Sequence, residues 1–118
     1  MEFALSEEQE ILSESVRKML EDNIDIDLLR NHSKGDDVIR GNIRQLVVEM
    51  GLPGILIPEE FGGSGLGVLE AALIAEEFGR YAVPTPWIGN SVMAPIALLY
   101  EKGNSLSEKW LPLIASGE

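Results

Sequence analysis

Apolar residues recur at helical spacing through most of this chain, and that periodicity restricts the fold more than any other feature. In the first segment, residues 7–22, the apolar positions are Ile11, Leu12, Val16, Met19 and Leu20. Ser6 followed by Gln9 fits the capping box that opens a helix, and Leu5 is placed as its hydrophobic staple. The first segment therefore predicts an amphipathic helix over residues 7–22.

The same periodicity, interrupted by glycine and proline, predicts four further helices. They are expected over about 37–50, 68–79 and 86–101, and from Ser105 or Ser107 to Gly117. Thr85 and Pro86 suit the N-cap and first residue of the helix over 86–101, and Pro95 predicts a kink or an early end within it. Residues 23–29 alternate briefly without a partner strand, so an irregular or short helical link is expected. The sequence therefore predicts a single all-α domain over residues 1–118, a bundle of about five helices.

The stretch IPEEFGGSGLG, residues 57–67, raises the question of a phosphate-binding loop. A P-loop would need a lysine, which does not follow Gly67, and a dinucleotide fingerprint would need glycine at the position of Val68. Acidic side chains also crowd the region, at Glu59, Glu60 and Glu70. The pattern favours a tight structural turn that lets the next helix pack closely.

Composition excludes several classes of function. The net charge is −11, from 20 acidic and 9 basic residues, so the chain lacks the basic surface of a nucleic-acid binder. The absence of cysteine excludes disulfides and thiol chemistry. The start of the chain does not read as a signal peptide, and no apolar run approaches the length of a membrane span. A cytoplasmic protein without membrane insertion is therefore expected.

The residues taken singly predict no catalytic, metal or cofactor site. His32 is the only histidine, lies in a polar segment beside Lys34, and is expected at the surface without a second metal ligand. Glu76 and Glu77 are adjacent, and adjacent helical residues do not face each other, so at least one should be solvated.

Three segments nevertheless resemble the N-terminal helical domain of acyl-CoA dehydrogenases. The most specific is GLPGILIPEEFGGSGLGVLEAALIAEEFGR, residues 51–80, which is similar to the family's glycine-rich loop and the Ala- and Leu-rich helix after it. LSEEQEILSESVRKML, residues 5–20, resembles the family's first helix, and SEKWLPLIASGE, residues 107–118, resembles the segment that closes the domain. In the family the glycine loop is a turn and not a phosphate cradle.

The resemblance implies a larger flavoenzyme of which this chain is one part. Family members add a middle β-domain with most of the FAD contacts and a C-terminal bundle with the catalytic glutamate, and neither is in this chain. The whole enzyme would oxidise an acyl-CoA to the 2,3-enoyl-CoA, and this domain would be inactive alone. The implied partners are acyl-CoA, the remaining domains of the same subunit, a second copy in a homo-oligomer, and electron-transfer flavoprotein.

The resemblance also implies substrate-binding residues around Gly89-Asn90-Ser91. Matching that motif to the family's acyl-chain pocket gives Thr85, Ile88, Gly89 and Val92. Their separations of three, four and seven would put them on one helix face. Ile88 and Val92 can equally be core residues. The prolines and tryptophan of VPTPW, residues 83–87, depart from common members, so a branched or bulky acyl group is as plausible as a straight one.

Two alternatives remain open on the sequence. The chain could be a free-standing helical interaction or dimerisation module, which predicts an apolar patch covered by self-association. It could also be part of a flavin oxidase or monooxygenase, which share the architecture.

Overall fold

The computed structural model describes residues 3–101, 103 and 105–118, and within them every regular element is helical. The six α-helices are α1 (Glu7–Asn23), α2 (Ile26–His32), α3 (Val38–Glu49), α4 (Val68–Arg80), α5 (Ala94–Tyr100) and α6 (Ser105–Ser116). Short 3-10 turns cover Leu52–Gly54 and Glu59–Phe61, and a π-helical segment covers Ile88–Met93. The predicted all-α fold is confirmed, and the link expected after the first helix contains the short helix α2.

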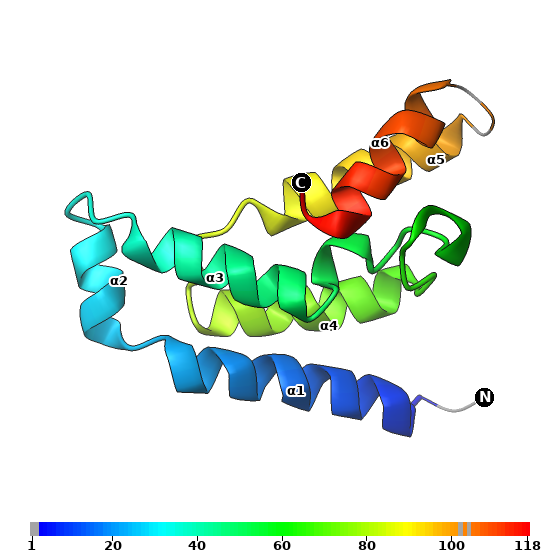
Figure 1. The fold of residues 1–118 in the computed structure, drawn as a ribbon. Helices are drawn as coiled ribbons and strands as arrows, with labels where there is room; N and C mark the ends of the chain where they lie inside the picture. The colour runs from blue at the N-terminus through cyan, green and yellow to red at the C-terminus, as the bar shows by residue number, and fades with distance from the viewer. Residues whose placement is uncertain (1–2, 102, 104) are drawn as a thin grey trace.

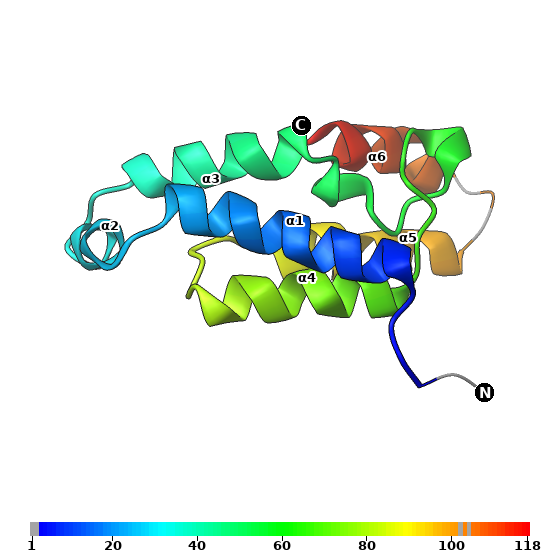
Figure 2. The ribbon, with the colours of Figure 1, turned by 90° about the horizontal axis from the view of Figure 1, so that it is seen from below.

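The helices form a flat body of 46 × 38 × 19 Å. α1 and α4 lie side by side, α3 packs above α4, and α5 and α6 pair at one end of the molecule (Figures 1 and 2). The buried core lies between these layers. Its main members are Val16, Leu20, Ile39, Ile43, Val47, Leu52, Ile55, Ile74, Phe78 and Trp87.

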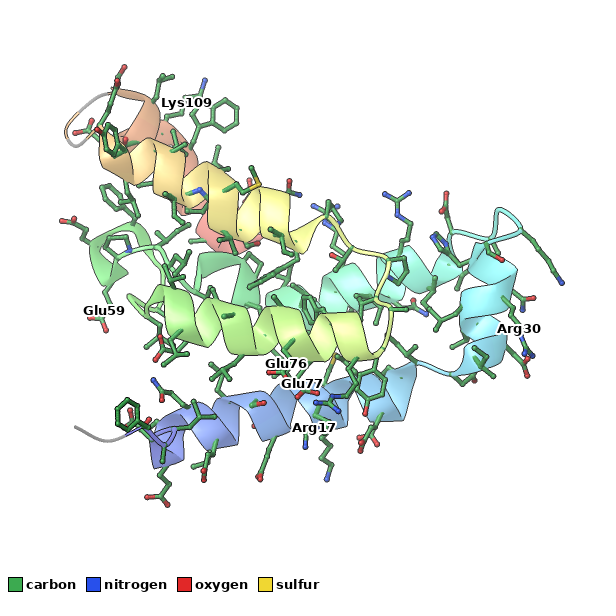
Figure 3. All side chains as sticks on the ribbon, turned by 180° about the vertical axis from the view of Figure 1, so that it is seen from behind. Arg17, Arg30, Glu59, Glu76, Glu77 and Lys109 are labelled. Carbon is green, nitrogen blue, oxygen red and sulfur yellow. The ribbon has the colours of Figure 1, made fainter. Side chains whose placement is uncertain are left out.

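Polar contacts fix α1 against α4 in a parallel register. The Gln9 amide donates to Glu70 at 2.8 Å near the start of both helices. About two turns of α4 further on, Arg17 donates to both oxygens of Glu77, at 2.7 and 3.1 Å. Because the sequence offset stays near 60 residues, the two helices run in the same direction. Figure 3 shows Arg17 and Glu77 pointing toward each other between the helices.

Glu77 and its neighbour Glu76 behave as their adjacency predicts. The Glu77 side chain is 1% exposed, whereas that of Glu76 is 65% exposed. The prediction that at least one of this pair is solvated is therefore confirmed.

The helix predicted over 86–101 begins one residue later than expected and contains a wide turn. Its first helical bond runs from the Asn90 amide to the Pro86 carbonyl at 3.1 Å, so Pro86 flanks the helix and Trp87 is its first residue. Within the segment the amide of Ala94 bonds to the carbonyl of Gly89, five residues back. Pro95 follows directly, and a proline lacks the amide that the regular ladder needs and clashes with the preceding turn. The widened turn accommodates the proline, and the helix continues to Tyr100, so the early end that the sequence allowed does not occur.

Trp87 anchors this helix to the rest of the molecule. Its side chain is buried, its indole nitrogen donates to the Leu52 carbonyl at 3.1 Å, and its ring meets Phe78 edge to face at 5.4 Å. The segment that carries the candidate substrate-binding residues is therefore held rigidly where it leaves the core.

Candidate functional site

The glycine-rich loop has no free amides with which to hold a phosphate. The amides of residues 62–66 all donate to backbone carbonyls between Gly54 and Glu59, and the amide of Gly67 donates to the Glu70 carboxylate at 2.9 Å. A Cβ at Gly63 would overlap the Ile57 backbone, so only glycine allows this approach. The prediction of a tight structural turn is confirmed.

Ile88 and Gly89 lie on an open part of the π segment. Ile88 is 54% exposed, and Gly89 is exposed as well. A Cβ built at Gly89 meets no atom within 4 Å, so the space above it is empty in this chain. Turns of this wide type are rare and recur at functional sites. The two residues together present a small, partly exposed apolar surface.

The other two predicted substrate-binding residues occupy different surroundings. Thr85 is half-buried just before the helix and lines a small cleft that Ile88 also lines. Val92 is half-buried and packs against the core. The structure therefore places Thr85 and Ile88 at one cleft, leaves Gly89 open beside Ile88, and packs Val92 against the core.

Trp87 does not project into that surface, because it is 2% exposed and faces the core. The large side chain of Trp87 is therefore part of the packed core and does not fill the open space above Gly89.

A larger groove lies on the other side of the same helix. It has a volume of about 710 Å³ and runs between α3, residues 84–94 and the C-terminal half of α6. Arg44 and Trp110 are among its lining residues, and sequence reasoning singled out neither of them as a site residue. The spacing of Arg40 and Arg44 places both on one face of α3, but nothing in the sequence shows that α6 lies opposite, some seventy residues later.

The perturbed carboxylates in the described part of the chain are structural. Hydrogen bonds from Arg17 lower the pKa of Glu77, against the opposing effect of its burial. The hydrogen bond from the Gln9 amide lowers the pKa of Glu70. Both groups therefore stay ionised at neutral pH and hold helices together, so neither is suited to exchange protons with a substrate.

His32 lies beside a backbone carbonyl, with its Nδ1 2.9 Å from the oxygen of Asp36. Among residues 3–101, 103 and 105–118, no three His, Cys, Asp or Glu side chains gather as a metal site. Across the same residues, no helix has the length and apolar character needed to span a bilayer.

Comparison with known proteins gives one consistent relationship. Residues 6–118 match the family described as "Acyl-CoA dehydrogenase, N-terminal domain". The acyl-CoA dehydrogenase IpdE2 of Mycolicibacterium smegmatis is 38% identical over 96 residues, which cover 80% of this chain and 30% of that protein. The acryloyl-CoA reductase (NADH) of Anaerotignum propionicum is 32% identical, over 99% of this chain and 29% of its own length. Mitochondrial isovaleryl-CoA dehydrogenase from Pongo abelii is 32% identical, over 97% of this chain and 27% of its length.

A solved structure shares the fold. The ChsE4-ChsE5 complex from Mycobacterium tuberculosis contains a chain that superposes with a TM-score of 0.75 at 22% identity, over 99% of this chain and 30% of that one. The present chain thus spans about 30% of the length of the relatives it matches. Because the family match covers nearly every residue, the chain belongs to the acyl-CoA dehydrogenase family, as its all-α N-terminal domain.

Proposed function

We propose that this chain is the N-terminal domain of an FAD-dependent acyl-CoA dehydrogenase that converts an acyl-CoA to its 2,3-enoyl-CoA. The observation that carries the proposal is the open apolar surface at Ile88 and Gly89, two residues that the resemblance assigns to the acyl-chain pocket. Thr85 borders it, and Val92 supports it from the core side. A pocket wall of this kind needs apolar side chains and a small residue that leaves room for an alkyl chain.

The chemistry is assigned to parts of the enzyme other than this chain. FAD would accept the β-hydride, and a glutamate of the C-terminal bundle would take the α-proton. The glycine loop offers FAD no phosphate site, because its amides already donate within the protein. The contribution of the described residues is to orient and enclose the acyl group.

The test is a Gly89→Leu variant of the complete dehydrogenase. The new side chain enters empty space in this domain, so the fold should persist while the acyl pocket shortens. We expect kcat/KM for long-chain substrates to fall by at least about tenfold, with short-chain substrates little affected. Ala72→Leu, at an exposed position of α4, is the matched control. Equal kinetics with long-chain substrates in Gly89→Leu and wild type would remove Gly89 from the pocket wall.

A second candidate is a non-catalytic interaction module. It is favoured by the exposed apolar residues of the same helix, Met93, Ile96 and Tyr100. The intact mass of the native protein separates the two. A mass several times 12.9 kDa, with flavin absorbance, supports the dehydrogenase, and a mass of 12.9 kDa supports the module. A flavin oxidase or monooxygenase would also give the larger mass, but would consume oxygen with its substrate.

Homo-oligomer formation and electron transfer to electron-transfer flavoprotein remain predictions for the complete enzyme.

A further inference from the structure

The groove between α3, residues 84–94 and α6, here called the α3–α6 groove, combines an apolar lining with a free cation. Trp110 and Ile114 contribute accessible apolar surface to it, and the buried side chains of Val47 and Trp87 border it. Its volume of about 710 Å³ lies within the range of small-molecule binding sites. Neither Ile88 nor Gly89 lines the groove, although Thr85 and Trp87 line both the groove and the small cleft at Ile88.

Arg44 is the cation that this groove leaves without a carboxylate. Its Nη2 donates to the Gly117 carbonyl at 2.9 Å, which positions the guanidinium without neutralising its charge. Arg44 takes part in none of the ion pairs that the described residues form. The chain has a net charge of −11, whereas the groove is lined by two basic side chains, Arg40 and Arg44, and two acidic ones, Asp37 and Glu118, so the acidic excess is absent here.

The other charged groups that line the groove neither bind an anion as readily as Arg44 nor neutralise it. Arg40 lies one helical turn before Arg44 but already pairs with Asp37 at 3.6 Å. Glu118 also borders the groove, but its carboxylate is not within ion-pair distance of Arg44. A ligand's anionic group can therefore reach the Arg44 guanidinium, whose planar donors suit a carboxylate.

We propose that the α3–α6 groove binds a small amphipathic anion, with its apolar body against Trp110 and Ile114 and its anionic group at Arg44. This site goes beyond the proposed acyl-chain wall and does not depend on it. The chain itself supplies a selective reporter, because its two tryptophans, Trp87 and Trp110, both line the groove.

The test measures tryptophan emission of the 118-residue chain during titration with octanoate and, separately, with the neutral octanol at low ionic strength. We expect octanoate to give a saturable change and to bind more tightly than octanol. Arg44→Gln should weaken octanoate binding by about twofold to fivefold and leave octanol binding unchanged. Arg44→Lys, which keeps the charge, should retain part of the difference in affinity between octanoate and octanol.

Arg30→Gln is the control, because it removes the same charge from a residue of α2 that does not line the groove (Figure 3). Its octanoate affinity should equal that of wild type. Equal affinity for octanoate and octanol, unchanged in Arg44→Gln, would overturn the proposal. The proposal would also be overturned if the tryptophan emission changed with protein concentration in the absence of ligand, because a second copy of the chain would then occupy the groove. None of these readouts depends on dehydrogenase activity, so the proposed function can fail without affecting this result.

Discussion

Glu77 shows most clearly how a single residue in this domain joins two helices. It lies on α4 and is 1% exposed, yet it is charged. Arg17 of α1 donates to both of its oxygens, Arg80 lies 3.3 Å from one of them, and Ser13 donates at 3.4 Å. Burying a carboxylate is unfavourable unless such partners satisfy it. The carboxylate therefore specifies how α1 docks, which an apolar residue at this position would not do.

Replacement of Glu77 by glutamine should destabilise the domain and change its response to acid. We expect the free energy of unfolding at neutral pH to fall by about 2 kcal/mol, because charge-assisted bonds become neutral ones. In the wild type the folded-state pKa of Glu77 lies below its ordinary value of 4.5. Its contribution is therefore fully present above that value and is lost as the pH falls through the folded-state pKa. Glu77→Gln should lack this part of the acid dependence.

Urea denaturation on both sides of pH ~4.5 measures both effects. Glu76→Gln is the control, because Glu76 is 65% exposed and pairs only with Arg80, also exposed, at 3.5 Å. Glu76→Gln should change the free energy of unfolding by no more than about 0.5 kcal/mol. The assignment fails if the two variants are equally stable and lose stability in parallel on acidification.

At the scale of elements, one carboxylate couples the N-termini of α1 and α4. Glu70 accepts from the Gly67 amide at 2.9 Å, which caps α4, and from the Gln9 side chain at 2.8 Å. Gln9 in turn accepts from the Ser6 amide at 2.9 Å and completes the capping box of α1. Each cap therefore helps to orient the other.

A double-mutant cycle on Gln9→Ala and Glu70→Ala should reveal that coupling. We expect the two losses of stability to be non-additive, with an interaction energy of about 0.5–1.5 kcal/mol. Gln45 and Glu49 form a comparable 2.9 Å amide–carboxylate bond, but within α3 and exposed to solvent. The same cycle on that pair should give no more than about 0.5 kcal/mol. Equal interaction energies in both cycles would mean that the contact between helices adds nothing.

The sequence predicted the helices well because local signals mark their ends. The capping box at Ser6 and Gln9 and the start of α4 after Gly67 appear in the structure as expected. What it did not predict is geometry that depends on distant contacts or on unusual turns. The π segment before Pro95 was not predicted, because the periodicity assumed a regular α-helix. The sequence also left open whether Val92 faces the core, against which the structure packs it. The α3–α6 groove was missed because Arg44 and Trp110 meet only through the tertiary fold.

The whole molecule exposes more surface than its mass requires. Its accessible surface is 7606 Å², compared with about 6,300 Å² for a compact monomer of this mass. Its radius of gyration is 15.1 Å, compared with about 13.5 Å for a typical domain of this length. The excess follows from the flat shape, which leaves the helix over residues 87–100 with one side uncovered (Figure 3). Exposed apolar side chains on that side are suited to contact a further domain.

If this surface is enclosed in a complete dehydrogenase, Met93 should report it. Met93 is 65% exposed in this chain, and Tyr100, seven residues further along the same helix, is 88% exposed. Hydroxyl-radical footprinting of the isolated chain should therefore oxidise Met93 nearly as fast as in the urea-unfolded chain. In the complete enzyme we expect a decrease of several-fold, because an acyl-chain wall must exclude water to strengthen the polar interactions around the reacting carbons. If Met93 were oxidised equally fast in both forms, the helix would face solvent in the enzyme, and its role in the acyl pocket would have to be abandoned.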